Sequence, residues 1–373
     1  MQNEAKKSIL FVLQDMRVGG AEKLRLTIGK YIDKKIYKTS YCCIREVGPV
    51  GDEVIKNGGE VTCLDSDDRF FNLFATFKLY RAVTKIHPDI IHSVLFNANF
   101  HARIVGALSG IPVITEEQGM YGWKKGYHRV ADRILSRFSY RIIAASQGVK
   151  DFLVKEDGIK PDKIAVIHNC IDPETLKADT TKYEERKRLG VSDADFVIGA
   201  IGNLRKEKGH SFLLEAIKKV KERHKKVKLF IVGDGPLRGH LITMSKELGV
   251  DRDVIFLGQK KEVAGFLKAL DLFVMPSLSE GLGIALLEAL FMSVPCIASS
   301  VGGMIEVAEK SSGVVLVEPG NPLKLADAIV DKITISVRGA GNNNNGFPDI
   351  FMPRYYVHKL EEIYAKALMD KKP

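Results

Sequence analysis

Short apolar runs alternate along the chain with longer segments in which apolar residues recur at helical spacing. In the first half the runs are SILFVL, KTSYCCI, EVTCL, DIIHSV, PVITEE, RIIAAS and KIAVIH. Runs of roughly four to eight such residues are typical of buried strands, and intervening segments such as AEKLRLTIGKYI are typical of helices. Because strands that alternate with helices form parallel sheets, this half of the sequence predicts a doubly wound α/β domain.

A second series of the same kind begins at FVIGAIGN and continues through KLFIVGDG, DVIFLG, LFVMPS, PCIASS and VVLVE. The two series are separated by DPETLKADTTKYEERKRLGVSDAD, a polar stretch without a strand signal. A chain of 373 residues is also too long for one ordinary core. We therefore expect two Rossmann-like, doubly wound domains, residues 1–180 and 181–345, that face each other across a cleft.

The end of the chain has a different pattern. A Gly/Asn-rich stretch, RGAGNNNNGFPD, follows the second series and predicts a loop. After it, Tyr356, Leu360, Ile363 and Tyr364 recur at helical spacing. The segment 346–373 is therefore expected to contain a closing helix.

Composition and charge narrow the class of protein. With 45% hydrophobic and 27% charged residues, the chain lies within the range of soluble globular proteins. The net charge of +10 suits a phosphate-rich ligand, an anionic membrane surface or nucleic acid. No nucleic-acid partner is expected, because no recognised nucleic-acid-binding module is present.

Two further features indicate a cytoplasmic protein. The five cysteines are odd in number and lack C-x-x-C spacing, which favours neither a disulfide framework nor a zinc site. The first apolar run, Ile9–Leu13, is far too short for a signal-peptide core or a membrane span. Any membrane contact is therefore expected to be peripheral, at the inner face of the cell membrane.

The most informative segment for chemistry is LFVMPSLSEGLGIALLEALF, which reads as a strand, a glycine-rich loop and a helix. Gly281 and Gly283 allow backbone N–H groups to approach an anion, and the helix start adds unpaired donors and the positive end of a dipole. Glu280 in the loop and Glu288 in the helix could contact different hydroxyls of one ligand. In the alternative interpretation, the glycines only form a tight turn and Glu288 is a solvated helix residue.

Three other turns follow predicted strands. Arg205 and Lys208 lie in the loop of FVIGAIGNLRKEKGH, where cations could stabilise a leaving diphosphate. Gly19 and Gly20 precede a helix in the first domain, and Gly233 lies in VGDGPLR. Each pattern also occurs in plain turns and solvated loops.

The segment GWKKGYHRVADRILSRFSYR mixes aromatic residues, among them Trp123, Tyr127 and Phe138, with several Lys and Arg residues. One interpretation is a helix at an anionic membrane interface, and the other is an ordinary surface helix with a basic outer face.

His92 ends a predicted strand and could reach a cleft, although a lone histidine there is more often structural. No H-E-x-x-H, P-loop or G-x-S-x-G pattern is present, which disfavours zinc hydrolases, nucleoside triphosphatases and serine hydrolases.

Together these segments give the chain a family resemblance. GGAE at 19–22, IGNLRKEKGH at 201–210, VGDGPLR at 232–238, PSLSEGLG with Glu280 and Glu288 seven residues apart, and VGGMIEV at 301–307 resemble the motifs of glycosyltransferase family 4. This family comprises retaining transferases with the GT-B fold. The resemblance implies a UDP-, GDP- or ADP-sugar as donor, no cofactor and no metal, and a glycan or lipid-linked acceptor bound mainly by the first domain.

The resemblance also implies roles for individual residues. Lys208, Arg205 and Glu280 are expected to be catalytic, with Lys208 on the diphosphate and Glu280 on donor-sugar hydroxyls. The remaining donor-binding residues are expected to be Gly19, Gly20, Asn203, Gly233, Gly281, Leu282, Gly283 and Glu288, the last on the ribose. The segment 346–373 resembles the family's last helix, which crosses back to the first domain.

Two positions depart from the family pattern. Asn203 stands where an arginine is usual, and Gln118 stands where a cleft histidine is usual. The function implied is retaining transfer of a sugar, with cell-envelope polysaccharide or glycolipid as the product. The alternatives are another GT-B activity, such as a sugar-nucleotide epimerase or a phosphorylase, and a degenerate transferase that serves as a partner subunit.

Overall fold

The structure is a computed structural model that describes residues 5–17, 19–67, 72–337 and 347–370. The chain divides into two compact units, of which unit 1 comprises Met1–Cys170 with Ile350–Pro373 and unit 2 comprises Ile171–Asp349. The division after Cys170 lies earlier than the expected boundary at residue 180. Most of the predicted Gly/Asn-rich loop, residues 338–346, lies outside the described residues.

Unit 1 is built on a seven-stranded parallel sheet in the order β3-β2-β1-β4-β5-β6-β7. The strands are β1 Lys7–Leu13, β2 Tyr37–Cys43, β3 Glu60–Cys63, β4 Ile90–Val94, β5 Val113–Glu117, β6 Ser139–Ala144 and β7 Ile164–Val166. The helices are α1 Gly20–Tyr31, α2 Gly48–Lys56, α3 Leu73–Ile86, α4 Phe96–Ser109, α5 Gly126–Leu135, α6 Gln147–Lys155 and α14 Pro353–Met369, with short 3-10 helices η1 Ser136–Phe138 and η2 Pro161–Lys163.

Unit 2 has a six-stranded parallel sheet in the order β10-β9-β8-β11-β12-β13. The strands are β8 Phe196–Ile201, β9 Val227–Val232, β10 Val254–Gly258, β11 Leu272–Met275, β12 Cys296–Ser299 and β13 Val314–Val317. The helices are α7 Lys182–Leu189, α8 His210–Arg223, α9 Arg238–Glu247, α10 Ala264–Ala269, α11 Ile284–Phe291, α12 Gly303–Lys310 and α13 Pro322–Val337, with η3 Pro173–Leu176 and η4 Lys206–Lys208; η5 is Asp349–Phe351.

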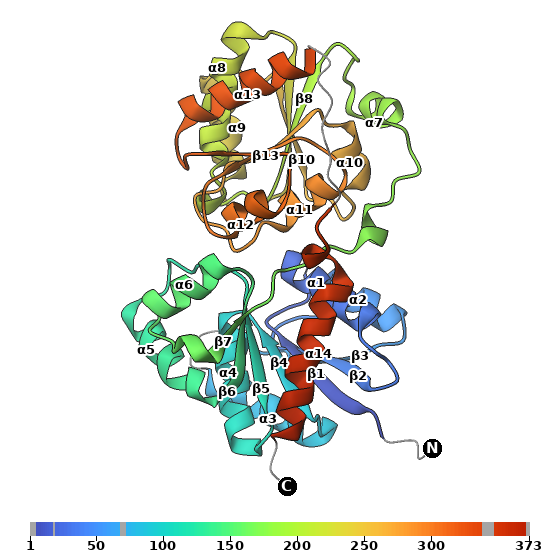
Figure 1. Ribbon diagram of the computed structural model, residues 1–373, viewed down its shortest axis with the longest axis vertical. Coiled ribbons are helices and arrows are strands. Elements are labelled where there is room, and N and C mark those ends of the chain that lie inside the picture. Colours follow the sequence, from blue (N-terminus) through green and yellow to red (C-terminus); the bar gives the residue numbers. More distant parts are fainter. Residues whose placement is uncertain (1–4, 18, 68–71, 338–346, 371–373) are drawn as a thin grey trace. The chain divides into compact units, whose positions relative to one another are not determined.

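These two sheets confirm the prediction of two doubly wound α/β domains. Every apolar run that predicted a strand forms one. The central strands enter the core on both faces of a parallel sheet, whereas the edge strand β3 is mostly exposed and the edge strand β13 is only partly buried. In unit 1, residues of β1 divide between two clusters: Ile9 and Phe11 pack with α1, α2 and α14, whereas Leu10 and Val12 pack with α3 and α4. The helices thus cover the two faces of the sheet in two layers (Figure 1).

A buried polar network joins α14 to the strands of unit 1. Arg25 on α1 forms a two-point ion pair with Glu116 on β5, and the Tyr356 hydroxyl donates to Glu116 Oε1 over 3.0 Å. His92 Nδ1 lies 2.6 Å from the Tyr364 hydroxyl. Burial opposes ionisation of Glu116, but Arg25 and His92 outweigh it and lower the pKa of the carboxyl to about 2. The last helix is therefore part of the core of unit 1.

Candidate functional site

The strand order of unit 2 shows where a ligand site can form. Strand β8 lies between β9 and β11, so the loops after β8 and β11 leave the sheet in opposite directions. In open α/β sheets, ligands bind outside the carboxyl ends of strands at such a switch point. The loops there are residues 202–209 and 276–283, which are the two segments that the sequence singled out for anion binding.

Two predicted site residues meet at this point. Lys208 Nζ lies 2.6 Å from Glu280 Oε2, and the Ser277 hydroxyl donates to the same carboxylate oxygen over 3.2 Å. The two charged side chains are only 23% and 14% exposed, so their charges are partly withdrawn from water. Ser277 itself is buried and was not predicted as a site residue, although it lies in the same PSLSEGLG loop.

The backbones of the two loops are in direct contact. The Leu278 amide donates to the Glu207 carbonyl over 2.8 Å. Gly209 has a φ of +66°, and a Cβ built on it would lie 2.0 Å from the Pro276 carbonyl oxygen. Gly209 therefore allows the loop after β8 to lie against the loop after β11, which places Lys208 beside Glu280.

Helix α11 begins at the same edge of the sheet. Gly283 precedes it with a φ of +90°, and the amides of Leu286 and Leu287 both donate to its carbonyl. The amides ahead of these two have no acceptor within the helix, and they carry its positive dipole end. Gly281, Leu282 and Gly283 are buried here, while Glu288 lies farther along α11 and is partly buried. This arrangement can hold a diphosphate.

A third loop, which follows β9, supports the first. The Leu204 amide donates to the Asp234 carbonyl over 2.9 Å, and a Cβ on Gly233, whose φ is +140°, would lie 2.0 Å from the Gly202 carbonyl oxygen. Asn203 and Arg205, on the supported loop, are exposed. The packing explains why position 233 is glycine whether or not a ligand contacts it.

His210 was not among the predicted site residues. It begins α8, two residues after Lys208, and is 3% exposed. Burial, reinforced by the charge of Lys208, lowers the pKa of its imidazole to about 4. A neutral ring therefore packs behind the lysine at neutral pH. The sequence could not show this, because the burial depends on contacts made by the folded loop.

Gly19 and Gly20 lie in unit 1, at the start of α1. Gly19 is the N-cap residue, in an extended conformation, and a Cβ on it would lie 2.3 Å from Glu22 Oε2. The Glu22 carboxyl thus folds back over the glycine. Burial, with a smaller contribution from Asp15, raises the pKa of Glu22 to about 7.

Gln118 and His92 have structural partners in unit 1. The Gln118 amide donates to Glu116 and accepts from Asn169, so this side chain belongs to the buried network of α14. His92 is completely buried, and its Nε2 lies 3.1 Å from Glu116 Oε2. The structural interpretation of His92 is the one that its surroundings favour, and burial lowers the pKa of its ring.

Sequence comparisons match the two units to two family models. The model described as "Glycosyltransferase Family 4" matches residues 18–175, and the one described as "Glycosyl transferases group 1" matches residues 195–334. The chain belongs to glycosyltransferase family 4. This family 4 glycosyltransferase is 27% identical over 308 residues to the putative glycosyltransferase EpsF of Bacillus subtilis, a match that spans 80% of each chain.

The name of a second relative includes a sugar donor and an acceptor. The chain is 26% identical over 310 residues to the UDP-Gal:alpha-D-GlcNAc-diphosphoundecaprenol alpha-1,3-galactosyltransferase of Escherichia coli, which is 79% of each chain. Among solved structures, Anabaena Alr3699/HepE in complex with UDP and glucose superposes with a TM-score of 0.85 at 22% identity, over 96% of this chain and 100% of that chain. WaaG, a glycosyltransferase involved in lipopolysaccharide biosynthesis, superposes with a TM-score of 0.69 at 15% identity, over 96% of this chain and 98% of that chain. These structures share the GT-B fold.

The described residues of this family 4 glycosyltransferase contain no cluster of three or more His, Cys, Asp or Glu side chains arranged to hold a metal ion. Among the helices they form, none combines the length and apolar character needed to cross a membrane.

Proposed function

We propose that this glycosyltransferase moves a sugar from a UDP-, GDP- or ADP-sugar to a glycan or lipid-linked acceptor, with retention of the anomeric configuration. Polysaccharide or glycolipid of the cell envelope would be the product. The proposal is supported by the galactosyltransferase relative, whose name includes a UDP-sugar and a diphosphoundecaprenol-linked sugar, and by the likeness to HepE bound to UDP and glucose.

In this mechanism Lys208, Arg205 and the first amides of α11 bind the diphosphate. The bond between the anomeric carbon and the phosphate oxygen breaks, and the diphosphate leaves with the electron pair. The acceptor hydroxyl attacks from the same face, and its proton passes to the departing phosphate oxygen. Fixed cations and peptide dipoles would neutralise the developing charge, so that no resident metal or cofactor is required.

The other residues would bind the rest of the donor. Glu280 would contact the sugar hydroxyls and Glu288 the ribose. Gly19, Gly20, Asn203, Gly233 and the run Gly281–Gly283 would line the donor site. The observation that carries the proposal is the pairing of Lys208 with Glu280 at the switch point of the sheet, beside the start of α11. A diphosphate entering there would replace Glu280 as the partner of Lys208.

The test compares Lys208→Ala and Glu288→Ala with Lys218→Ala, which removes an exposed cation from α8. Loss of Lys208, a preorganised charge partner of the transition state, is expected to lower kcat by roughly a hundredfold or more. Loss of Glu288 should depress transfer strongly through weaker binding of the ribose, and the control should keep full activity. NMR of the product gives the anomeric configuration. Full activity in both site variants, an inverted product, or conversion of the donor without acceptor would contradict the proposal.

We also infer that the protein works in the cytoplasm, in contact with the inner face of an anionic membrane. The supporting observations are the net charge of +10, the odd number of cysteines without C-x-x-C spacing, and the lipid-linked substrate in the name of the Escherichia coli relative.

A further inference from the structure

The outer surface of unit 1 carries an unusual density of exposed apolar side chains. More than half of the exposed large hydrophobic side chains in the described part of the chain lie between Leu73 and Phe138. On α5, Tyr127, Val130 and Ile134 point outward at helical spacing, and each is at least 50% exposed. Trp123, just before this helix, is 56% exposed. Single exposed hydrophobic residues are ordinary, but a helical row of them indicates a binding surface.

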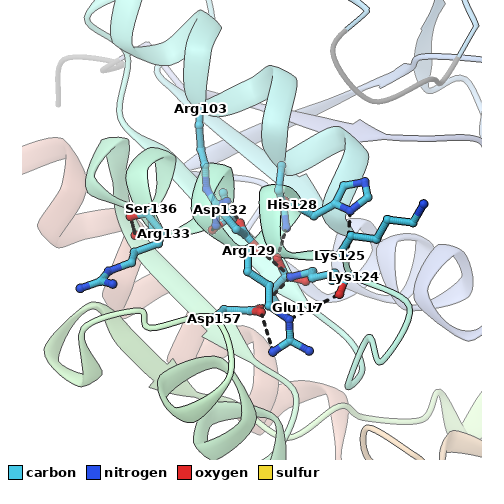
Figure 2. Close-up of polar contacts among 12 residues, drawn as sticks. Arg103, Glu117, Lys124, Lys125, His128, Arg129, Asp132, Arg133, Ser136 and Asp157 are labelled. Atoms are coloured by element: carbon cyan, nitrogen blue, oxygen red, sulfur yellow. Dashed lines mark hydrogen bonds and ion pairs between the residues drawn. The ribbon is translucent and has the colours of Figure 1, made fainter.

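Helix α5 is inverted relative to an ordinary surface helix, because its inner face is polar. Asp132 is buried against Arg103, and it accepts from Lys124 Nζ over 2.5 Å. The same ammonium donates to Asp157 over 2.8 Å, as Figure 2 shows. These ion pairs therefore hold α5 against the rest of unit 1, and its apolar row faces solvent. The outer side of α5 carries this apolar row together with the exposed cation Arg133.

Helix α3 adds a second apolar row to the same face of unit 1. Leu73, Phe74 and Phe77 are each more than half exposed, while Ala75 and Leu79 on the opposite side of the helix enter the core. Helix α4 packs against α3 and also against α5 and η1, so the two rows flank one helix. The layer of α1, α2 and α14 covers the other face of the sheet (Figure 1). We call the exposed side of α3, α4, α5 and η1 the apolar face.

The charges of the apolar face have one sign. Its exposed ionic side chains are Arg81, Lys85, Lys125, Arg133 and Arg137. The single carboxylate within α3, α4, α5 and η1 is Asp132, which is buried and paired. Asp65 and Asp67 are exposed ahead of α3 and mark the edge of the face. Apolar side chains surrounded by cations match the interface of an anionic lipid bilayer.

We propose that the apolar face docks this protein on an anionic membrane, with the aromatic side chains at headgroup level and the cations on lipid phosphates. A second copy of the chain fits less well, because a symmetric contact places the same patch on both sides and would oppose like charges. The inference deepens the proposed function, since it rests on an acceptor or product held at a membrane. It assigns the contact to particular helices of unit 1.

Trp123 is the only tryptophan in the sequence, so its fluorescence reports directly on this face. Full-length protein is titrated with vesicles of phosphatidylcholine alone and with vesicles that also contain phosphatidylglycerol, without donor or acceptor. We expect a blue shift and co-sedimentation with the phosphatidylglycerol vesicles. Raising the salt concentration should weaken this binding, because the electrostatic part is screened.

Two pairs of variants test the assignment. Arg133→Glu with Arg137→Glu should weaken vesicle binding by at least about tenfold, whereas Lys34→Glu with Lys35→Glu, an equal change of net charge elsewhere in unit 1, should not. Tyr127→Ser with Val130→Ser and Ile134→Ser should weaken it similarly. Tyr183→Ser with Leu323→Ser, at exposed sites in unit 2, is the matched control. All the altered side chains are exposed, so the melting temperature should hardly change.

Several outcomes would overturn the proposal: no blue shift with either vesicle, equal binding to phosphatidylcholine alone, or equal losses in test and control variants. Self-association that the α5 serine variant abolishes, without vesicle binding, would make the face a contact between copies. Thermal shifts with UDP, GDP and ADP on the same sample separate these results from failure of the donor site. A protein that binds one of these nucleotides but no vesicle contradicts the docking inference alone.

Discussion

Two glycines of unit 2 share a left-handed backbone conformation but differ in their surroundings. Gly209 has a φ of +66° and Gly190 a φ of +70°. A Cβ on Gly209 would lie 2.0 Å from the Pro276 carbonyl oxygen, whereas a Cβ on Gly190 would meet nothing within 4 Å. Alanine substitutions at these two positions therefore separate the free energy cost of the backbone conformation from the cost of a clash between the two site loops.

We predict that Gly190→Ala lowers the free energy of unfolding by about 1 kcal/mol, the usual penalty for a side chain in this conformation. Gly209→Ala should cost roughly twice that or more, because the loops must also move apart. Urea unfolding measures the change in stability, and calorimetry with whichever of UDP, GDP and ADP binds the parent protein measures the change in nucleotide affinity. Gly209→Ala should weaken nucleotide binding and Gly190→Ala should not; equal effects of the two variants would contradict the contact between the loops.

Glu22 in the GGAE motif provides a prediction about pH. Its pKa is raised from 4.5 to about 7, first by burial and then by Asp15. A carboxyl with a raised pKa holds its proton more tightly in the folded state, so its contribution to stability is present at low pH. That contribution is lost as the pH rises from about 4.5 toward about 7.

Glu22→Gln should remove this loss. Between pH 4.5 and 7, the free energy of unfolding of the variant should rise relative to that of the parent by an amount on the order of 1 to 3 kcal/mol. Melting temperatures measured across this pH range would follow the change. Glu60→Gln, at an exposed carboxyl of β3, is the matched control for the loss of one negative charge. A parallel pH dependence of the parent and Glu22→Gln would show that Glu22 titrates normally in the folded protein.

At the scale of elements, helix α14 is held by a tyrosine hydroxyl that reaches a buried carboxylate. The Tyr356 hydroxyl donates to Glu116, whose charge is neutralised by Arg25. The neighbouring Tyr355, on the same helix, is 39% exposed. Burial of an ionised group requires that its hydrogen-bond partners be present.

Tyr356→Phe should therefore destabilise unit 1 by about 1 to 3 kcal/mol, because a lone pair of buried Glu116 loses its donor. For a unit of this size we expect the melting temperature to fall by roughly 2 to 4 °C per kcal/mol. Tyr355→Phe is the matched control and should change it little. Hydrogen exchange would localise the effect of Tyr356→Phe to α14 and β5; identical behaviour of the two variants would contradict this role.

At the scale of the whole molecule, donor binding should appear as stability. A nucleoside diphosphate that binds only the folded state should stabilise the protein by about 2.7 kcal/mol at a concentration one hundred times its Kd. Thermal shifts with UDP, GDP and ADP would identify the nucleotide. We expect the shift to survive EDTA and to be largely lost in Lys208→Ala, whereas Lys218→Ala should keep it.

A shift that disappears with EDTA and returns with a divalent ion would contradict diphosphate binding by cations and helix dipoles alone. No shift with any of the three nucleotides would contradict the donor site itself.

Much of the fold and part of the site could be predicted from the sequence. Every strand from Lys7–Leu13 to Val314–Val317 coincides with a predicted run, and the signal is clearest for the central strands because a strand covered on both faces is apolar at most positions. The loops of Lys208 and Glu280 were recognised from glycines and charges that follow such strands. Their roles toward the donor stay predictions.

What the sequence by itself determined is therefore local: which segments become strands and helices, and which loops carry cations beside glycines. Tertiary structure alone decided which distant groups meet. Arg25, Glu116 and Tyr356 are far apart in the chain, and no pattern of spacing joins them. It also decided which face of α5 is buried, because the pairing of Asp132 with Lys124 and Arg103 turns the charges inward and leaves the apolar row outside. Helical periodicity indicates that a helix has two different faces, and only the elements packed against it determine which face is exposed to solvent.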